Sequence, residues 1–453
     1  MITEPTPAQL LRLDRPGPRY TSYPTVPVWT EDGVSDADLR AAVAGVQGDV
    51  SVYVHIPFCK EQCWFCGCNQ VVSRRQSAGD RYLDALEAQL RSMPLPPGVR
   101  AQRVHLGGGT PTWFDGPQIA RLMDLLDRYT PRTEGAEFSV EIDPDVTSDA
   151  QLDLLAQRGC TRVSLGVQST DDAVLEAIHR PQDTQRVVDL MARARAHGMT
   201  GLNIDLVYGL PYQTEATFAR TLEVVAELAP DRLAAYSYAH VPWLKKHQRR
   251  IEEAALPEPA DKLGLFLQAR RFLAQHGYEP IGMDHFARPD DELAVAARAG
   301  HLHRNFMGYT TLRGVPLIGY GVSAISEVGG LFAQQQPHLG AWYRATAEVE
   351  GPPVVHRGYR MTRDDEVRGE LIAELMCNFG VDVEAFEQRH DLVFAEAFAD
   401  ELAALAPLVD DGLVSWTPQR VQVSELGRLL VRNVAMPFDA HLPTTKARFS
   451  RTV

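Results

Sequence analysis

Short apolar runs rich in β-branched residues alternate with helical patterns between residues 51 and 236, and this alternation constrains the fold more than any other feature of the chain. The runs are 51–56, 103–106, 137–142, 162–165, 202–206 and 232–236. Helical patterns between them include 82–90, 119–126 and 217–228. Strands that alternate with helices form a parallel sheet, so we expect an α/β fold, an incomplete (β/α)6 TIM-like barrel whose site lies at the C-terminal ends of the strands. An open doubly wound sheet is the alternative.

Both ends of the chain differ from this central region. Residues 1–48 carry six prolines and a short helical pattern at 36–43, which predicts an N-terminal arm or lid. Residues 49–355 are expected to hold the barrel and its extension. From about residue 356, Thr362 and Asp365 resemble a capping box, and the runs 414–416 and 421–423 predict a hairpin. We expect a small, mostly helical, winged-helix-like domain at 356–453. We expect this domain to pack against the barrel rather than to bind DNA.

The composition is that of a folded protein that does not bind nucleic acid. Its 453 residues are 45% hydrophobic, which suits well-packed cores. A formal net charge of -14 disfavours a nucleic-acid partner, because phosphate binding needs concentrated lysine and arginine. No stretch approaches the roughly 18 consecutive apolar residues that span a bilayer, and the N-terminus lacks the pattern of a signal peptide. We expect no membrane partner and a cytoplasmic location.

Four of the six cysteines lie within ten residues, directly after the first expected strand: Cys59, Cys63, Cys66 and Cys68. A structural zinc site usually takes two separated ligand pairs, a disulfide is disfavoured in the cytoplasm, and polar residues 60–62 indicate a solvated loop. An iron-sulfur site is therefore favoured, with zinc left open. Three thiolates would hold three irons of a cube and leave the fourth iron open. Cys68 lies only two residues beyond Cys66, so we expect a packed thiol or a hydrogen donor rather than a ligand.

Glycines and carboxylates follow other strands. Gly108, Gly109 and Thr110 come after the second expected strand, where missing side chains would let backbone amides approach a ligand. An ordinary turn is the alternative. Glu141 ends the third strand and Asp205 the fifth, so both carboxylates could face the same edge and accept hydrogen bonds from hydroxyl or ammonium groups. For Asp205 a helix N-cap is the alternative.

The Cys-x-x-x-Cys-x-x-Cys spacing after a first strand resembles the signature of radical S-adenosylmethionine (SAM) enzymes. Further motifs resemble one family among them, the oxygen-independent coproporphyrinogen III oxidases, from about residue 17 to the C-terminus. These motifs are Gly17-Pro-Arg-Tyr-Thr-Ser-Tyr-Pro24, Tyr53-Val-His-Ile-Pro-Phe-Cys59, Cys-Gly-Cys-Asn at 66–69, Gly107-Gly-Gly-Thr-Pro-Thr112, Gly166-Val-Gln168, Asn203-Ile-Asp-Leu-Val-Tyr-Gly-Leu-Pro211 and Gly282-Met-Asp-His-Phe-Ala-Arg-Pro-Asp-Asp-Glu292.

The resemblance implies a 4Fe-4S cluster on Cys59, Cys63 and Cys66, together with SAM, of which two molecules are expected. Positions that contact the cluster-bound SAM in the family match Tyr53, Gly108, Glu141 and Ile325. Positions that contact a second molecule match Phe65, Gly109, Thr110, Gln168, Arg180, Asp205 and Ala239. For Arg180 a surface ion pair is the alternative.

The resemblance also implies a reaction: anaerobic oxidative decarboxylation of two propionates of coproporphyrinogen III to vinyl groups, which gives protoporphyrinogen IX in haem biosynthesis. A 5'-deoxyadenosyl radical made from SAM would remove hydrogen from the propionate. Such an oxidoreductase needs no catalytic side chain beyond its cofactors. A polyanionic tetrapyrrole does need basic groups near aromatic rings. The candidates are Arg19, Tyr20, Arg288, His303 and Arg304.

Two other functions compete with this interpretation. A haem-binding chaperone of the same superfamily is the main alternative, but those relatives generally lack the motif at 17–24 and the fourth cysteine. A zinc-stabilised regulatory module with a winged-helix end is the third possibility. For the enzyme we expect a monomer that receives electrons from a protein such as a flavodoxin or ferredoxin.

Overall fold

The computed structural model describes residues 5–347, 354–445 and 449–451, and the chain divides into two compact units. One unit, called the sheet unit, comprises Thr30–Pro257 and Gly314–Arg360. The other, called the terminal unit, combines Met1–Trp29, Glu258–Arg313 and Met361–Val453. The arm expected at 1–48 is therefore shared between the two units.

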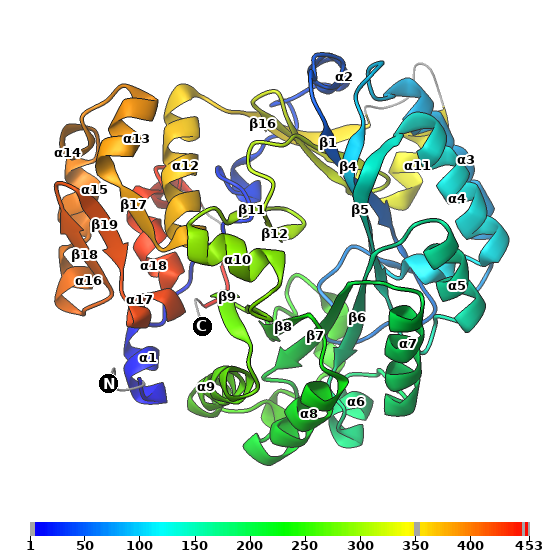
Figure 1. Cartoon of the computed structure of the whole chain (residues 1–453), viewed down its shortest axis with the longest axis horizontal. Helices are drawn as coiled ribbons and strands as arrows, with labels where there is room; N and C mark the ends of the chain where they lie inside the picture. The colour runs from blue at the N-terminus through cyan, green and yellow to red at the C-terminus, as the bar shows by residue number, and fades with distance from the viewer. Residues whose placement is uncertain (1–4, 348–353, 446–448, 452–453) are drawn as a thin grey trace. The chain divides into compact units, whose positions relative to one another are not determined.

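A mostly parallel sheet forms the centre of the sheet unit (Figure 1). Neighbouring strands pair in parallel in the order β1-β4-β5-β6-β7-β8. Their bounds extend the predicted runs by a few residues: β1 (Val50–Ile56), β4 (Ala101–Gly108), β5 (Arg132–Ile142), β6 (Arg162–Gln168), β7 (Gly201–Tyr208) and β8 (Arg232–Ser237). The predicted α/β class is confirmed.

The two faces of these strands differ in chemistry, because successive side chains of a strand point to opposite sides. One face is apolar and buried; it includes Val52, Val54, Val104, Leu106, Phe138, Val140, Leu165 and Ile204. On the other face the pairing register places Tyr53 opposite His105 and His105 opposite Ser139. Polar side chains from several strands thus gather on one face of the sheet.

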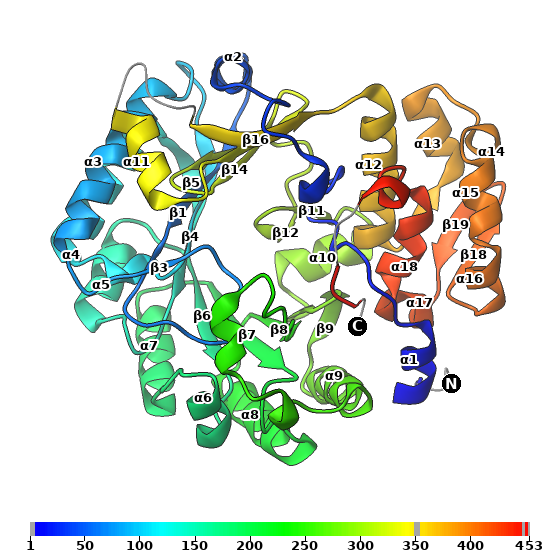
Figure 2. The same ribbon diagram turned by 180° about the vertical axis from the view of Figure 1, so that it is seen from behind.

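Helices connect successive strands, and α3, α4, α5 and α7 lie along one side of the sheet (Figures 1 and 2). The three predicted helices are confirmed within α3, α4 and α8. The helices of this unit are α2 (Asp36–Ala44), α3 (Ser77–Ser92), α4 (Gly116–Tyr129), α5 (Asp149–Gln157), α6 (Asp172–Ala177), α7 (Thr184–Ala196), α8 (Glu215–Leu228) and α11 (Leu339–Ala347). Asp115 and Thr214 cap α4 and α8 and set their starts ahead of the predicted ones.

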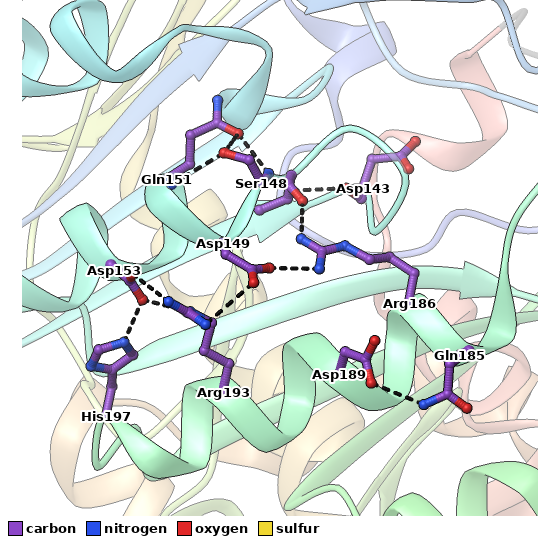
Figure 3. Close-up of polar contacts among 11 residues, drawn as sticks. Asp143, Ser148, Asp149, Gln151, Asp153, Gln185, Arg186, Asp189, Arg193 and His197 are labelled. Atoms are coloured by element: carbon purple, nitrogen blue, oxygen red, sulfur yellow. Dashed lines mark hydrogen bonds and ion pairs between the residues drawn. The ribbon is translucent and has the colours of Figure 1, made fainter.

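Ion pairs join α5 to α7 on the surface of the sheet unit (Figure 3). The Arg193 guanidinium lies 2.5 Å from an Asp153 carboxylate oxygen and 3.2 Å from one of Asp149. Arg186 lies 2.6 Å from the second Asp149 oxygen. Side-chain hydrogen bonds, first from Arg193 and then from His197, hold the pKa of Asp153 well below its usual range. Such exposed pairs contribute little to stability and mainly fix how neighbouring helices align.

Antiparallel strands extend the sheet beyond β1, which the sequence analysis did not predict. β13 (Leu317–Tyr320) pairs in parallel with β1, and β14 (Ile325–Val328), β15 (Leu331–Gln335) and β16 (Val355–Arg360) follow in antiparallel order. Two short strands, β2 (Phe58–Cys59) and β3 (Val71–Val72), flank the cysteine loop.

The terminal unit is mostly helical. Its helices are α1 (Pro7–Leu13), α9 (Pro259–Gln275), α10 (Glu292–Ala299), α12 (Arg363–Asn378), α13 (Val383–His390), α14 (Phe394–Ala397), α15 (Ala399–Ala404), α16 (Ala406–Asp410), α17 (Glu425–Leu429) and α18 (Val431–Ala435). Its strands are β9 (Glu279–Gly282), β10 (His285–Ala287), β11 (His303–Asn305), β12 (Gly308–Thr310), β17 (Gly380–Asp382), β18 (Val414–Thr417) and β19 (Arg420–Val423).

Two predictions for this unit are confirmed. Thr362 and Asp365 form the capping box of α12, and β18 pairs with β19 as the predicted hairpin. Helix α1 was missed, although Thr6 and Gln9 form a capping box around Pro7. Within the described ranges no helix is both long and apolar enough to cross a membrane.

Candidate active site

The cysteine loop begins directly after β1, as the sequence predicted. Cys59, Cys63 and Cys66 are half-buried and Cys68 is exposed, and none of them forms a disulfide. Burial raises the pKa of the Cys59 thiol to about 12, and the nearby Cys66 and Cys63 add to this rise. A hydrogen bond from the Cys68 thiol lowers the pKa of Cys66 to about 7. The loop therefore gathers thiols that interact with one another electrostatically.

This donor set fits an iron-sulfur cube better than a single metal ion. Among the residues that the structure describes, no group of three or more His, Cys, Asp or Glu side chains is close enough to hold one ion. In a cube each cysteine binds a different iron, so its ligands lie farther apart than those of a zinc ion. Three cysteines on one loop that do not gather tightly enough to hold a single ion are compatible with this wider spacing.

Arg180, whose side chain is 11% exposed, reaches the cysteine loop from the segment after α6. Its guanidinium lies 3.4 Å from the Cys63 sulfur, 3.0 Å from an Asp143 carboxylate oxygen and 2.5 Å from the Gly166 carbonyl oxygen. Its Nε atom is buried without a hydrogen-bond partner in the described part of the chain. Arg180 is thus an interior cation beside a cysteine rather than a surface ion-pair residue, and it keeps one donor available for a ligand.

The glycines after β4 are required by the protein's own packing. Gly108 has a φ of +119°, and a Cβ there would lie 2.6 Å from the His55 ring. A Cβ on Gly109 would lie 2.6 Å from the Phe58 carbonyl oxygen, at the start of the cysteine loop. Thr110 is buried, and its hydroxyl lies 3.8 Å from the Cys59 sulfur. The backbone at Gly109 therefore lies closer to the backbone of the cysteine loop than an ordinary turn requires.

Glu141 and Asp205 lie on the polar face with opposite titration behaviour. Burial raises the pKa of Glu141, but a 3.3 Å contact with His105 and a 3.0 Å hydrogen bond from the Gly108 amide outweigh burial and leave that pKa below its usual value. Burial and the Glu141 charge raise the pKa of Asp205 to about 6. Hydrogen bonds from Ser164 and Asn203 hold its carboxylate at 2.9 and 2.8 Å. Asp205 lies within β7 and caps no helix.

The remaining predicted cofactor residues lie within β1, at or near the ends of other strands, or in the cysteine loop. The Tyr53 ring stacks on His105, and its hydroxyl lies 3.0 Å from Nδ1 of His55. Ile325 begins β14, and Gln168 ends β6 with a φ of +67°. Phe65 packs against an apolar cluster that includes Val207 and Leu210. Ala239 follows β8, and its carbonyl accepts a hydrogen bond from Gln248.

A short 3-10 helix, η3 (Lys246–Arg250), follows β8. Side chains of this helix, and of the residue before it, donate hydrogen bonds to backbone carbonyls of the cysteine loop. His247 donates to the Cys66 carbonyl at 2.7 Å, because a carbonyl can only accept. Gln248 donates to the Phe65 carbonyl at 3.0 Å, and Lys245, just before η3, donates to that of Cys68 at 3.1 Å. This support was not predicted from the sequence.

The five candidate substrate residues all belong to the terminal unit. Arg19 forms an ion pair with Asp284, and the Tyr20 hydroxyl donates to Asp439 at 3.1 Å. Arg288 lies over the Tyr278 ring, and His303 is half-buried in β11. The Nε and Nη1 atoms of Arg304 are buried without a hydrogen-bond partner in the described ranges, while its guanidinium lies 4.8 Å from the Tyr309 ring centre.

Comparison with known proteins places this site in a family. The Radical SAM superfamily model matches residues 53–225, and the HemN C-terminal domain model matches residues 361–430. An oxygen-independent coproporphyrinogen III oxidase of Escherichia coli strain K12 is 47% identical over 441 residues, 96% of each chain. The chain belongs to the oxygen-independent coproporphyrinogen III oxidase family.

Other members of the family agree. An oxygen-independent coproporphyrinogen III oxidase of Synechocystis is 38% identical over 98% of both chains. A solved structure, described as coproporphyrinogen III oxidase (HemN) from Escherichia coli, a radical SAM enzyme, superposes with a TM-score of 0.91. The match covers 93% of this chain and 97% of that one at 47% identity. The predicted family is confirmed, and the fold is that of a radical SAM protein with a helical C-terminal region.

Two histidines of the polar face were missed although the sequence held a signal for them. His55 lies two residues after the predicted Tyr53, and His105 lies two residues before Gly107, which begins the motif at 107–112, so strand alternation places each on the same face as that motif residue. His105 also lies 2.6 Å from the Ser139 hydroxyl and so links Ser139 to Glu141. Applying the two-residue period outward from the motifs would have found both residues.

Proposed function

We propose that this protein carries out the anaerobic oxidative decarboxylation of two propionate groups of coproporphyrinogen III to vinyl groups, yielding protoporphyrinogen IX in haem biosynthesis. The carrying observation is 47% identity along 96% of both chains with the Escherichia coli coproporphyrinogen III oxidase. The thiol loop after β1, with Arg180 beside it, supports the same activity.

Cys59, Cys63 and Cys66 would hold the 4Fe-4S cluster, and when bound, the cluster and SAM supply the radical that attacks the propionate. Around them the chain provides position and charge. Glu141, kept anionic by His105 and the Gly108 amide, would hold a cationic group of SAM together with Tyr53 and Ile325.

A second SAM molecule is also proposed. Phe65, Gly109, Thr110, Gln168, Asp205 and Ala239 would line its site, and Arg180 would offer its unpartnered Nε. Asp205, already fixed by Ser164 and Asn203, would accept hydrogen bonds from hydroxyl groups.

The substrate residues are proposed from their chemistry. Arg304 combines two unpartnered guanidinium nitrogens with the Tyr309 ring, which suits a carboxylate carried on a flat macrocycle. Arg19, Tyr20, Arg288 and His303 remain further candidates, with 17–25 as a lid. Proposals from the sequence also include an incomplete (β/α)6 barrel, boundaries at residues 48 and 355, a cytoplasmic monomer, and a flavodoxin or ferredoxin as electron donor.

An anaerobic assay of the reconstituted protein with SAM, dithionite and coproporphyrinogen III tests the activity. We expect protoporphyrinogen IX, measured by chromatography and mass spectrometry after oxidation to the porphyrin. A haem-binding chaperone would instead retain added haem through gel filtration and form no vinyl product, and that result would reject the proposal.

A further inference from the structure

A basic and apolar surface lies beside the cysteine loop. Trp243 and Leu244 are 59% and 71% exposed, which is unusual for large apolar residues. Lys246, Arg249 and Arg250 follow within six residues and are exposed as well. We call residues 243–250 the basic surface.

The positive charge of this surface is local and is not neutralised by the protein. The chain as a whole carries a formal charge of -14, yet residues 232–251 contain no Asp or Glu. In the described ranges neither Lys246 nor Arg249 has an ion-pair partner, whereas arginines such as Arg186 and Arg193 pair with carboxylates. Unpaired charges beside exposed apolar side chains are typical of a surface that binds an oppositely charged protein.

The basic surface also contacts the cysteine loop directly. His247 and Lys245 donate hydrogen bonds to the carbonyls of Cys66 and Cys68. Arg250 lies 5.8 Å from the centre of the Trp64 ring, which is next to Cys63 in sequence. A partner docked on this surface would therefore be separated from the cysteine loop by one layer of side chains.

We propose that the basic surface is the docking site of a small acidic one-electron carrier protein. This inference rests on the proposed function, because only an enzyme with a reducible cluster needs such a partner. In each transfer the carrier loses one electron and the cluster gains one, with no bond made or broken. Lys246 and Arg249 meet carboxylates of the carrier, and Trp243 and Leu244 pack against its apolar centre.

Binding to a flavodoxin tests the proposal without a loaded enzyme. Titration calorimetry of the apo protein with oxidised flavodoxin should show binding that weakens as salt rises, because exposed charges are screened. In the double variant Lys246→Glu/Arg249→Glu the Kd should rise about tenfold or more. The matched control is Arg91→Glu/Arg128→Glu, which makes the same charge change in the last turns of α3 and α4. Helices in βα units run antiparallel to the strands, so these turns lie at the edge opposite the cysteine loop.

Turnover separates this inference from the function on which it rests. With reduced flavodoxin the turnover rate of the double variant should be about tenfold lower than that of the wild type. With dithionite the two rates should be equal. Equal flavodoxin affinity in the wild type and the double variant, or no binding by the wild type, would overturn the docking site. A raised KM for coproporphyrinogen III with dithionite would also overturn it, because the surface would then serve the polyanionic substrate. Absence of product from the wild type with dithionite would instead reject the proposed function.

Discussion

At the residue scale, the polar face of the sheet keeps two carboxylates in different states. Glu141 receives hydrogen bonds that favour its anion, whereas Asp205 is half-buried close to that same anion. Without a ligand, the charge on Asp205 opposes folding once it ionises. The arrangement is therefore suited to binding more than to stability, because hydroxyl donors of a ligand would relieve this cost.

The pH dependence of stability measures that cost. The unfolded carboxylate ionises near 3.8 and the folded one near 6, so stability falls as pH rises between these values and the cost is complete above the folded pKa. Asp205→Asn removes this charge. The free energy of unfolding of the apo variant minus that of the apo wild type should therefore grow by up to about 3 kcal/mol as pH rises from about 4 to about 8. Urea melts across pH provide this difference.

The control for that experiment is Asp189→Asn, at an exposed position of α7. Its difference from wild type should stay constant across the same pH range. A constant difference for Asp205→Asn as well would mean that burial and the Glu141 charge do not raise the pKa of Asp205 in solution.

At the element scale, β4 and the cysteine loop are coupled through glycine. The Gly109 amide donates to the Ile56 carbonyl and that of Thr110 to the Phe58 carbonyl, both at 2.8 Å. There is no room between the two segments for a methyl group on Gly109. The position of the loop therefore depends on the strand beside it.

A matched pair of glycine substitutions tests this coupling. Gly109→Ala should push the cysteine loop away, reduce iron bound per chain after reconstitution and destabilise the protein by about 1–3 kcal/mol. Gly116→Ala, at the first position of α4 with no atom within 4 Å of the added Cβ, should keep full iron content and change stability by less than about 1 kcal/mol. Equal iron content in both variants would show that the approach of the two segments does not position the loop.

At the scale of the whole molecule, the sequence predicted what is local and periodic. The parallel strands, helices α3, α4 and α8 and the hairpin β18-β19 followed from apolar periods of 2 and 3.6 residues. Among the missed strands, β14 and β15 form a hairpin around Gly329 and Gly330, a turn signal in the sequence that was overlooked. β13 and β16 show no strict alternation of apolar and polar residues, and β16 pairs with β15 across distant positions, such as Leu331 with Arg360.

The same limit explains which parts of the site were missed. The cysteines lie in one motif, but their supports His247 and Gln248 come from about 180 residues later in the chain. Arg180 could be predicted as a site residue only from the family resemblance, because its contacts with Cys63 and Asp143 depend on how the sheet folds. Motifs therefore proposed the ligands, and the structure was needed to find which residues support the cysteine loop.

The central claim is that the three-cysteine loop starts the reaction of this family. Its most direct test compares anaerobic formation of protoporphyrinogen IX by Cys63→Ser with that by Cys160→Ser, a matched change at a buried cysteine of the same unit whose thiol donates to the Arg162 carbonyl. Melting temperatures first establish that both variants are folded. The account then predicts no vinyl product from Cys63→Ser and as much vinyl product from Cys160→Ser as from the wild type. Vinyl product from Cys63→Ser at the wild-type rate would contradict it.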